Sequence, residues 1–162
     1  MATRCIFTPF AAEFPATNFP QLLLSNRRPV LAFDGATDEA CFFTGLAPQG
    51  LTGAITVVIT YAAASATTGT CRFEALLEAI TDGDATDTDA ATSFDATNSN
   101  GAAVPATAGY IDQISITMTN ADSLTAGDYF RLQLNRDANG TTGTDDVATD
   151  VYVLAVELRD AA

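Results

Sequence analysis

Long stretches of this chain alternate between apolar and polar residues, and this alternation constrains the fold more than any other feature of the sequence. Residues 54–62, AITVVITYA, place Ile55, Val57 and Ile59 on one face of an extended strand and threonines on the other. Segments 112–120, 128–136 and 150–160 alternate in the same way. A period of two residues is typical of antiparallel strands that pack on one face only.

Shorter segments add to this pattern. Residues 71–80, CRFEALLEAI, fit a strand, although Phe73, Leu76 and Ile80 also follow helical spacing. We interpret this segment as a strand because it is short and follows another strand closely. The remaining candidates are 4–10, 29–34 and 40–45. The sequence therefore predicts an all-β, eight-stranded antiparallel sandwich of two sheets, most simply a jelly roll. An immunoglobulin-like sandwich is the competitor, but its characteristic tryptophan is absent.

The first 29 residues differ from the rest. Pro9, Pro15, Pro20 and Pro29 interrupt them, and proline removes backbone donors, so we expect an extended arm that is not paired in a sheet. The sequence thus divides into an arm, residues 1–29, and a jelly-roll domain, residues 30–162. The arm carries regularly spaced phenylalanines and would lie over its own sandwich or over a neighbouring subunit.

The charge balance excludes several classes of function. The chain has 20 acidic and 7 basic residues, a net charge of −13, and no lysine, histidine or tryptophan. Such a surface repels phosphate backbones and anionic lipid, so we expect neither nucleic-acid nor membrane binding. Without histidine or lysine there is no Ser-His-Asp relay, Schiff base or phosphate-binding loop. We therefore predict a protein without catalytic residues or cofactors.

Two loops are rich in aspartate. The first, residues 81–101, contains Asp82, Asp84, Asp87, Asp89 and Asp95 with no basic residue. Neither this loop nor residues 136–150 matches the spacing of a calcium loop, and paired carboxylates on flexible loops make poor glycosidase dyads. The sequence predicts two solvated loops that hold no metal.

The cysteines and the N-terminus bear on location. Cys5, Cys41 and Cys71 are too far apart for a zinc knuckle, and a disulfide between two of them is the alternative to three reduced, buried thiols. The start of the chain lacks a basic segment followed by an apolar one, so we expect no secretion by the usual route.

Four segments, 26–45, 51–80, 109–137 and 150–160, resemble jelly-roll head decoration or appendage proteins of tailed bacteriophages. The likeness rests on strand order and on the phrases RPVLAFD, SLTAGDYFRLQLNRD and LAVELRD. It implies a homotrimer that is assembled in the bacterial cytoplasm and sits on the capsid surface of the virion. There it would bind the major capsid protein and cement adjacent subunits.

In this hypothesis the arm supplies the contacts with the partner. The apolar contacts come from Phe7, Phe10, Phe14 and Phe19, and Arg27 and Arg28 pair with acidic groups. Alternatively, the phenylalanines cap the protein's own core. The rival function is a host-receptor or glycan-binding appendage, which the absence of tryptophan and the presence of only four tyrosines disfavour.

Overall fold

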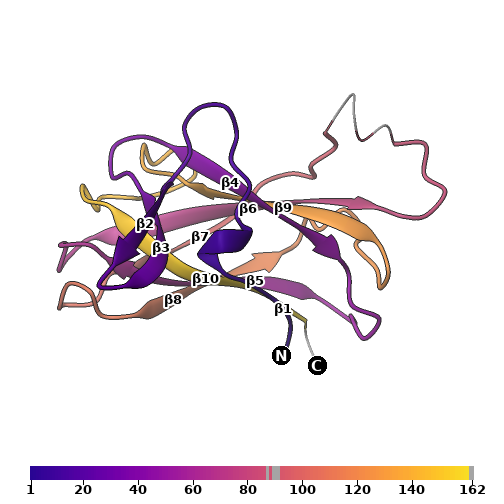
Figure 1. Ribbon diagram of the computed structural model, residues 1–162, viewed down its shortest axis with the longest axis horizontal. Coiled ribbons are helices and arrows are strands. Elements are labelled where there is room, and N and C mark those ends of the chain that lie inside the picture. Colours follow the sequence, from indigo (N-terminus) through magenta and orange to yellow (C-terminus); the bar gives the residue numbers. More distant parts are fainter. Residues whose placement is uncertain (87, 89–91, 161–162) are drawn as a thin grey trace.

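The computed structural model describes residues 1–86, 88 and 92–160 and shows two antiparallel β-sheets packed face to face (Figure 1). One sheet has six strands and the other has four. The elements are β1 (Ala2–Phe7), the 3₁₀ turn η1 (Pro9–Ala11), β2 (Gln21–Ser25), β3 (Arg28–Phe33), β4 (Glu39–Leu46), β5 (Ile55–Ala63), β6 (Thr70–Ile80), β7 (Asn98–Ala103), β8 (Asp112–Met118), β9 (Tyr129–Arg136) and β10 (Val151–Asp160).

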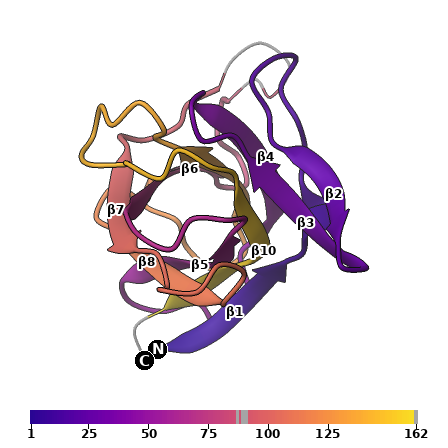
Figure 2. The same cartoon turned by 90° about the vertical axis from the view of Figure 1, so that its left-hand side faces the viewer.

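The eight strands from β3 to β10 are connected as a jelly roll. Along this stretch the first strand pairs with the last, β3 with β10, and the pairing continues inward as β4 with β9, β5 with β8 and β6 with β7. The order is β2-β3-β10-β5-β8 in one sheet and β4-β9-β6-β7 in the other, with β1 beside β10. Figure 2 looks along the sandwich and shows the layers on either side of the core. The predicted all-β jelly-roll sandwich is confirmed.

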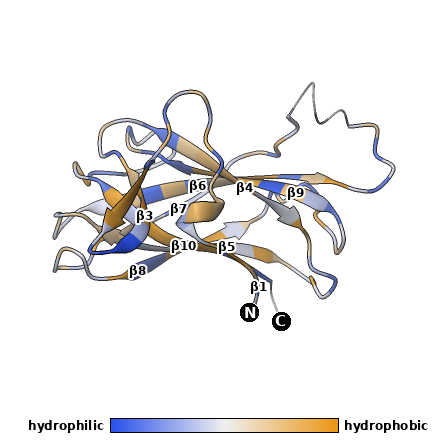
Figure 3. Ribbon diagram, in the orientation of Figure 1, coloured by the Kyte–Doolittle hydropathy of each residue, from blue (hydrophilic) through white to orange (hydrophobic). Residues whose placement is uncertain are grey.

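The core lies between the two sheets and is made by the apolar faces that the alternation predicts. In β9, Phe130, Leu132 and Leu134 are fully buried. The aromatic ring of Phe73 on β6 packs edge-on against Phe33 on β3, with 5.4 Å between the ring centres. Figure 3 shows the change of hydropathy from residue to residue along these strands. The buried side chains of the two sheets form one apolar core.

The structure has ten strands where the sequence predicts eight. The two additional strands are β2 and β7. β7 reads NSNGAA and has no apolar face of its own, and its existence depends on pairing with β6 from Thr70 to Ala75. β2 contains three consecutive leucines and so lacks a period of two. Neither strand carries the periodic signal from which strands are recognised.

The expectation that residues 1–29 stay unpaired is wrong for much of that segment. β1 pairs with β10 and β2 pairs with β3. Between them, Glu13 exchanges two backbone hydrogen bonds with Phe42 on β4. The prolines do not prevent this, because Pro9, Pro15 and Pro20 fall outside the two strands and Pro29 lies near the start of β3.

The three cysteines are free thiols. Cys41 and Cys71 are buried as predicted, and burial raises the pKa of the Cys71 thiol to about 12. Cys5 is only partly buried. In the part of the chain that the structure describes, no helix has the length and apolar character needed to cross a membrane.

The two phenylalanines on either side of Pro9 should contribute unequally to stability. The Phe7 ring stacks on Phe43 with 5.1 Å between centres, whereas Phe10 is 70% exposed. We expect Phe7→Ala to lower the free energy of unfolding by about 3–5 kcal/mol, as for other buried aromatic truncations. Phe10→Ala is the matched control and should change it by less than about 0.5 kcal/mol. Urea denaturation of the variants measures both, and equal losses would contradict this assignment of the core.

Candidate functional site

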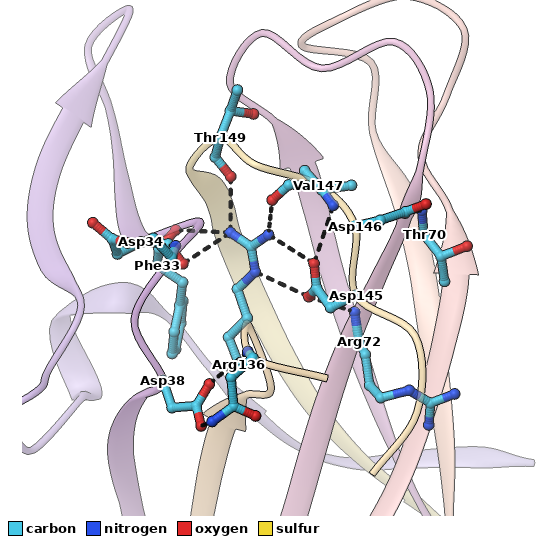
Figure 4. Close-up of polar contacts among 12 residues, drawn as sticks. Phe33, Asp34, Asp38, Thr70, Arg72, Arg136, Asp145, Asp146, Val147 and Thr149 are labelled. Carbon is cyan, nitrogen blue, oxygen red and sulfur yellow. Dashed lines mark hydrogen bonds and ion pairs between the residues drawn. The ribbon is translucent and has the colours of Figure 1, made fainter. Parts of the chain in front are cut away.

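The buried guanidinium of Arg136 organises one end of the sandwich. Arg136 is the last residue of β9. It follows the alternation that turns Phe130, Leu132 and Leu134 into the core, and it is fully buried. Its Nε and Nη2 donate to the two carboxylate oxygens of Asp145, at 3.1 and 3.0 Å. The remaining donors reach backbone carbonyl oxygens of Phe33, Asp34, Val147 and Thr149 (Figure 4). A buried cation is tolerated because both its charge and its donors are satisfied.

This ion pair connects three segments that are distant in the sequence. The carboxylate of Asp145 also accepts a hydrogen bond from the backbone N–H of Arg72 on β6, at 2.9 Å. The turn after β3 lies so close to the loop after β9 that a Cβ atom on Gly35 would stand 2.6 Å from the backbone of Ala148. Asn139 donates from its backbone N–H to the carboxylate of Asp38, at 3.0 Å. The β3–β4 turn, loop 137–150 and the start of β6 therefore form one rigid end.

The prediction of a solvated loop at residues 136–150 is wrong for several of its residues. The side chains of Arg136, Asp137 and Asp145 are almost completely buried, and Val147 is buried as well. Asp137 accepts hydrogen bonds from the backbone N–H and hydroxyl groups of Thr141 and Thr142, at 2.7–2.9 Å. These carboxylates hold the loop together instead of keeping it soluble.

In the first aspartate-rich loop, Asp87 and Asp89 lie outside the described residues. Asp84 accepts a hydrogen bond from the backbone N–H of Thr81, and Asp95 accepts one from that of Asp122. Among the residues that the structure describes, no three His, Cys, Asp or Glu side chains are grouped as a metal site would require.

The open face of the four-stranded sheet carries a row of polar side chains beside aromatic rings. The pairing register places Phe42, Gln133 and Leu76 side by side on β4, β9 and β6. One step along, the register aligns Asn135 with Glu74. Gln133 donates to Asn135 at 2.9 Å, and Asn135 donates to Glu74 at 3.2 Å. This chain of hydrogen bonds holds three planar polar groups in fixed positions on a rigid sheet.

A groove of about 350 Å³ lies over these side chains. Its lining includes Phe42, Gln133, Asn135 and Glu74 from the sheet. The segment beside the edge of β4 adds Pro15, Thr17 and Asn18, and the rigid end adds Asp38, Glu39 and Arg136. Asn18 is held in place by its carbonyl oxygen, which accepts a hydrogen bond from the Ala40 N–H at 2.9 Å. Burial raises the pKa of the Glu39 carboxyl, and the charges of Asp34 and Asp150 act in the same direction.

A cluster around Arg131 separates this groove from a second hollow on the same face. The Arg131 guanidinium carbon lies 5.0 Å from the centre of the Phe42 ring and 5.5 Å from that of Phe94. Arg131 also pairs at 3.5 Å with Glu78, which accepts a hydrogen bond from the Ser93 backbone N–H. The second hollow, of about 250 Å³, is lined by Glu13, Glu78, Ile80, Thr88, Tyr129 and Arg131. The two hollows follow each other along β9.

The residues predicted to bind a partner do not gather in one place. Phe7 is in the core, as the alternative hypothesis holds. Phe14 and Phe19 contact each other, with ring centres 5.5 Å apart, and both are 41% exposed, while Phe10 is more exposed still. Arg27 and Arg28 are exposed at the β2–β3 turn. A role of the exposed residues in docking stays a prediction.

Sequence reasoning missed the groove and the buried arginine. The alternation that places Arg131, Gln133 and Asn135 outward also places Arg136 inward. The sequence pattern of β9 therefore already indicated that Arg136 would be buried. The groove had no such signal, because its wall at residues 15–18 depends on contacts between distant segments.

No family model and no curated protein matches the sequence. Among solved structures, the chain is similar to part of a family GH115 4-O-methyl-alpha-glucuronidase with specificity for decorated arabinogalactans, at 12% identity and a TM-score of 0.51. That match covers 100% of this chain and 18% of the glucuronidase. This likeness shows the fold alone.

Two smaller proteins align over most of their length. One is the CBM22-2 xylan-binding domain from Paenibacillus barcinonensis Xyn10C, with 15% identity, a TM-score of 0.49, and coverage of 93% of this chain and 92% of that domain. The other is CBM35 from Cellvibrio japonicus Abf62, with 10% identity, a TM-score of 0.44, and coverage of 98% and 95%.

Removing the buried guanidinium should destabilise the protein strongly. Arg136→Met leaves the buried Asp145 carboxylate without its cation and four carbonyl groups without their guanidinium donors, so we expect a loss of about 3–5 kcal/mol in the free energy of unfolding. Gln49→Met, at an exposed position, is the control and should be nearly neutral. Denaturant titration measures both values. A change below 1 kcal/mol in Arg136→Met would contradict the central role of this ion pair.

Stability should decrease in acid partly through Asp137. Burial acts to raise the pKa of this carboxyl, but the hydrogen bonds from Thr142 and Thr141 outweigh burial and lower it below its ordinary value. A group with a depressed pKa in the folded state stabilises the protein above its unfolded pKa, about 3.9, and this contribution is lost as the pH falls through the folded pKa.

The test compares wild type with Asp137→Asn by chemical denaturation between pH 7 and pH 2.5. We expect wild type to be more stable at neutral pH and the difference to shrink in acid. Asp82→Asn, on an exposed turn, is the control and should show no such convergence. If the difference in stability between wild type and Asp137→Asn does not change with pH, protonation of Asp137 does not contribute to the loss of stability in acid.

Proposed function

We propose that this chain is a non-catalytic glycan-binding module and that the groove on the open face of the four-stranded sheet is its site. The observation that carries the proposal is the row Gln133, Asn135 and Glu74 beside the Phe42 ring, at the floor of an open groove. Sugars present hydroxyl groups at their edges and C–H groups on their faces. Planar amide and carboxylate groups bind the edges, and an aromatic ring packs against a face.

The charge of the groove favours a neutral glycan. Asp38, Glu39 and Glu74 line it, and the arginine among its lining residues, Arg136, is already paired with Asp145. A uronic acid would meet carboxylates without a free cation, so its binding would be opposed electrostatically. The polar row and the second hollow extend along β9 from Tyr129 to Asn135, about 20 Å at the rise of an extended strand. This length suits a chain of sugars better than a single monosaccharide.

Two carboxylates of this face, Glu74 and Glu78, are engaged in ways that fit binding better than hydrolysis. Glu78 is 2% exposed and is engaged by Arg131 and Ser93, and Glu74 accepts a hydrogen bond from Asn135. A glycosidase needs one carboxylic acid free to protonate the leaving oxygen and a second carboxylate free to act on the sugar or on water. Both glutamates instead hold neighbouring side chains in place.

The fold is compatible with this function, since the glucuronidase that contains a similar domain has specificity for decorated arabinogalactans. Arabinogalactan is therefore the first ligand to test. The hypothesis of a capsid decoration protein, with a major capsid protein as partner and a homotrimer as assembly state, stays a prediction from the sequence. Location on the virion is likewise a prediction.

Binding can be tested with a panel of soluble polysaccharides: arabinogalactan, xylan, galactan and, as an acidic member, polygalacturonic acid. We expect at least one neutral member to retard the protein in affinity gel electrophoresis and polygalacturonic acid not to. Gln133→Ala should weaken binding roughly tenfold, because each polar contact contributes about 1–1.5 kcal/mol. Phe42→Ala should weaken it at least as much.

Tyr110→Ala is the matched control, because this aromatic side chain is 64% exposed and does not line the groove. It should bind as wild type does. Melting temperatures of all three variants separate loss of binding from loss of folding. Affinity that is unchanged in both groove variants, or no retention by any neutral polysaccharide, would refute the proposed site.

A further inference from the structure

The β2–β3 hairpin presents an exposed, apolar strand at the edge of the six-stranded sheet. All three leucines of β2 are solvent-accessible, Leu22 by 42%, Leu23 by 39% and Leu24 by 72%. Figure 2 shows the hairpin projecting from the body of the sandwich, and Figure 3 shows the apolar character of β2. Within the described residues, β2 pairs with β3 alone. Its other edge therefore offers unpaired backbone N–H and C=O groups, which is a template for pairing with another strand.

The turn of this hairpin carries a local positive charge on a strongly acidic protein. Arg4, Arg131, Arg136 and Arg159 each form an ion pair within the chain. Arg27 and Arg28 are exposed, and no carboxylate among the described residues pairs with them. An apolar strand that ends in two free arginines fits an acidic partner, and this chain, with a net charge of −13, is such a partner.

We propose that β2 pairs antiparallel with β2 of a second copy, around a two-fold axis at Leu23. In this register Ser25 of one copy lies opposite Gln21 of the other, so the turn at Asn26 and Arg27 reaches toward the residues that precede β2 in the other copy. The Asn18 carbonyl oxygen accepts a hydrogen bond from Ala40, so Asn18 lies beside the start of β4, where Asp38 and Glu39 stand. The two-fold axis thus brings the free arginines of each copy toward the acidic start of β4 in the other, and the contact is self-complementary.

This pairing joins the six-stranded sheets of two copies edge to edge and buries the leucines. The polar row of the proposed glycan groove is on the other sheet, whereas the free arginines of the second copy approach the end of the groove at Asn18, Asp38 and Glu39. Two linked sites on one polysaccharide bind more tightly than either alone because the second contact is intramolecular. The pairing itself does not rest on glycan binding and can be tested without any ligand.

The experiment measures the mass of the purified full chain by light scattering coupled to gel filtration at tens of micromolar. We expect twice the 16.8 kDa of one chain. The double variant L22K/L24K places like charges at the pairing edge and should run as a monomer. The double variant R27E/R28E should weaken the pair at least tenfold in dissociation constant. Raised salt should weaken the wild-type pair as well, since its exposed charges are screened.

The matched control is Leu46→Lys, which adds the same charge at a leucine that is 69% exposed and lies on β4, in the four-stranded sheet. It should remain a dimer. Far-ultraviolet circular dichroism and melting curves confirm that each variant folds. A monomeric wild type, a trimeric wild type, or a dimer that survives both double variants would each overturn the proposed pairing.

Discussion

The ion pair between Arg136 and Asp145 is the interaction on which one end of the molecule depends. An arginine without solvent must have every donor satisfied, and here the β3–β4 turn and loop 137–150 supply the acceptors from their backbones. The loop cannot move away without exposing a buried charge to an apolar interior. The loop has fourteen residues, 137–150, but this length does not make it flexible. The carboxylate of Asp137 also stabilises its conformation by accepting hydrogen bonds from within the loop.

The candidate site depends on this end of the sandwich. Asp38 and Glu39 line the groove where the β3–β4 turn enters β4, and Arg136 holds that turn through the carbonyl oxygens of Phe33 and Asp34. Gln133 and Asn135 stand on the same strand as Arg136, facing the opposite side. A single strand thus supports the polar row on its outward face and the buried cation at its inward end. A site built on paired strands is held more precisely than one built on loops alone.

The two sheets have different surfaces and suit different roles. The four-stranded sheet presents polar side chains and aromatic rings in a groove, bounded by the segment that Glu13 and Asn18 attach to β4. The six-stranded sheet ends at β2, an apolar edge that nothing in the described chain covers. The proposed groove and the proposed association edge belong to different sheets and approach each other at Asn18.

The sequence by itself determined the fold class, since alternation in segments such as 54–62 and 128–136 requires one buried face and one exposed face. It also placed eight of the strands, and it excluded histidine and lysine chemistry by composition. Only the tertiary structure decided which strands pair, because β2 and β7 become strands through the hydrogen bonds of β3 and β6. The tertiary structure alone buries the side chains of Asp137 and Asp145, although aspartate is usually exposed to solvent. It also brings Asn18 beside β4, where it forms one wall of the groove. The physical reason is that local patterns report which face of a segment is apolar, whereas sites and buried charges arise from contacts between segments far apart in the chain.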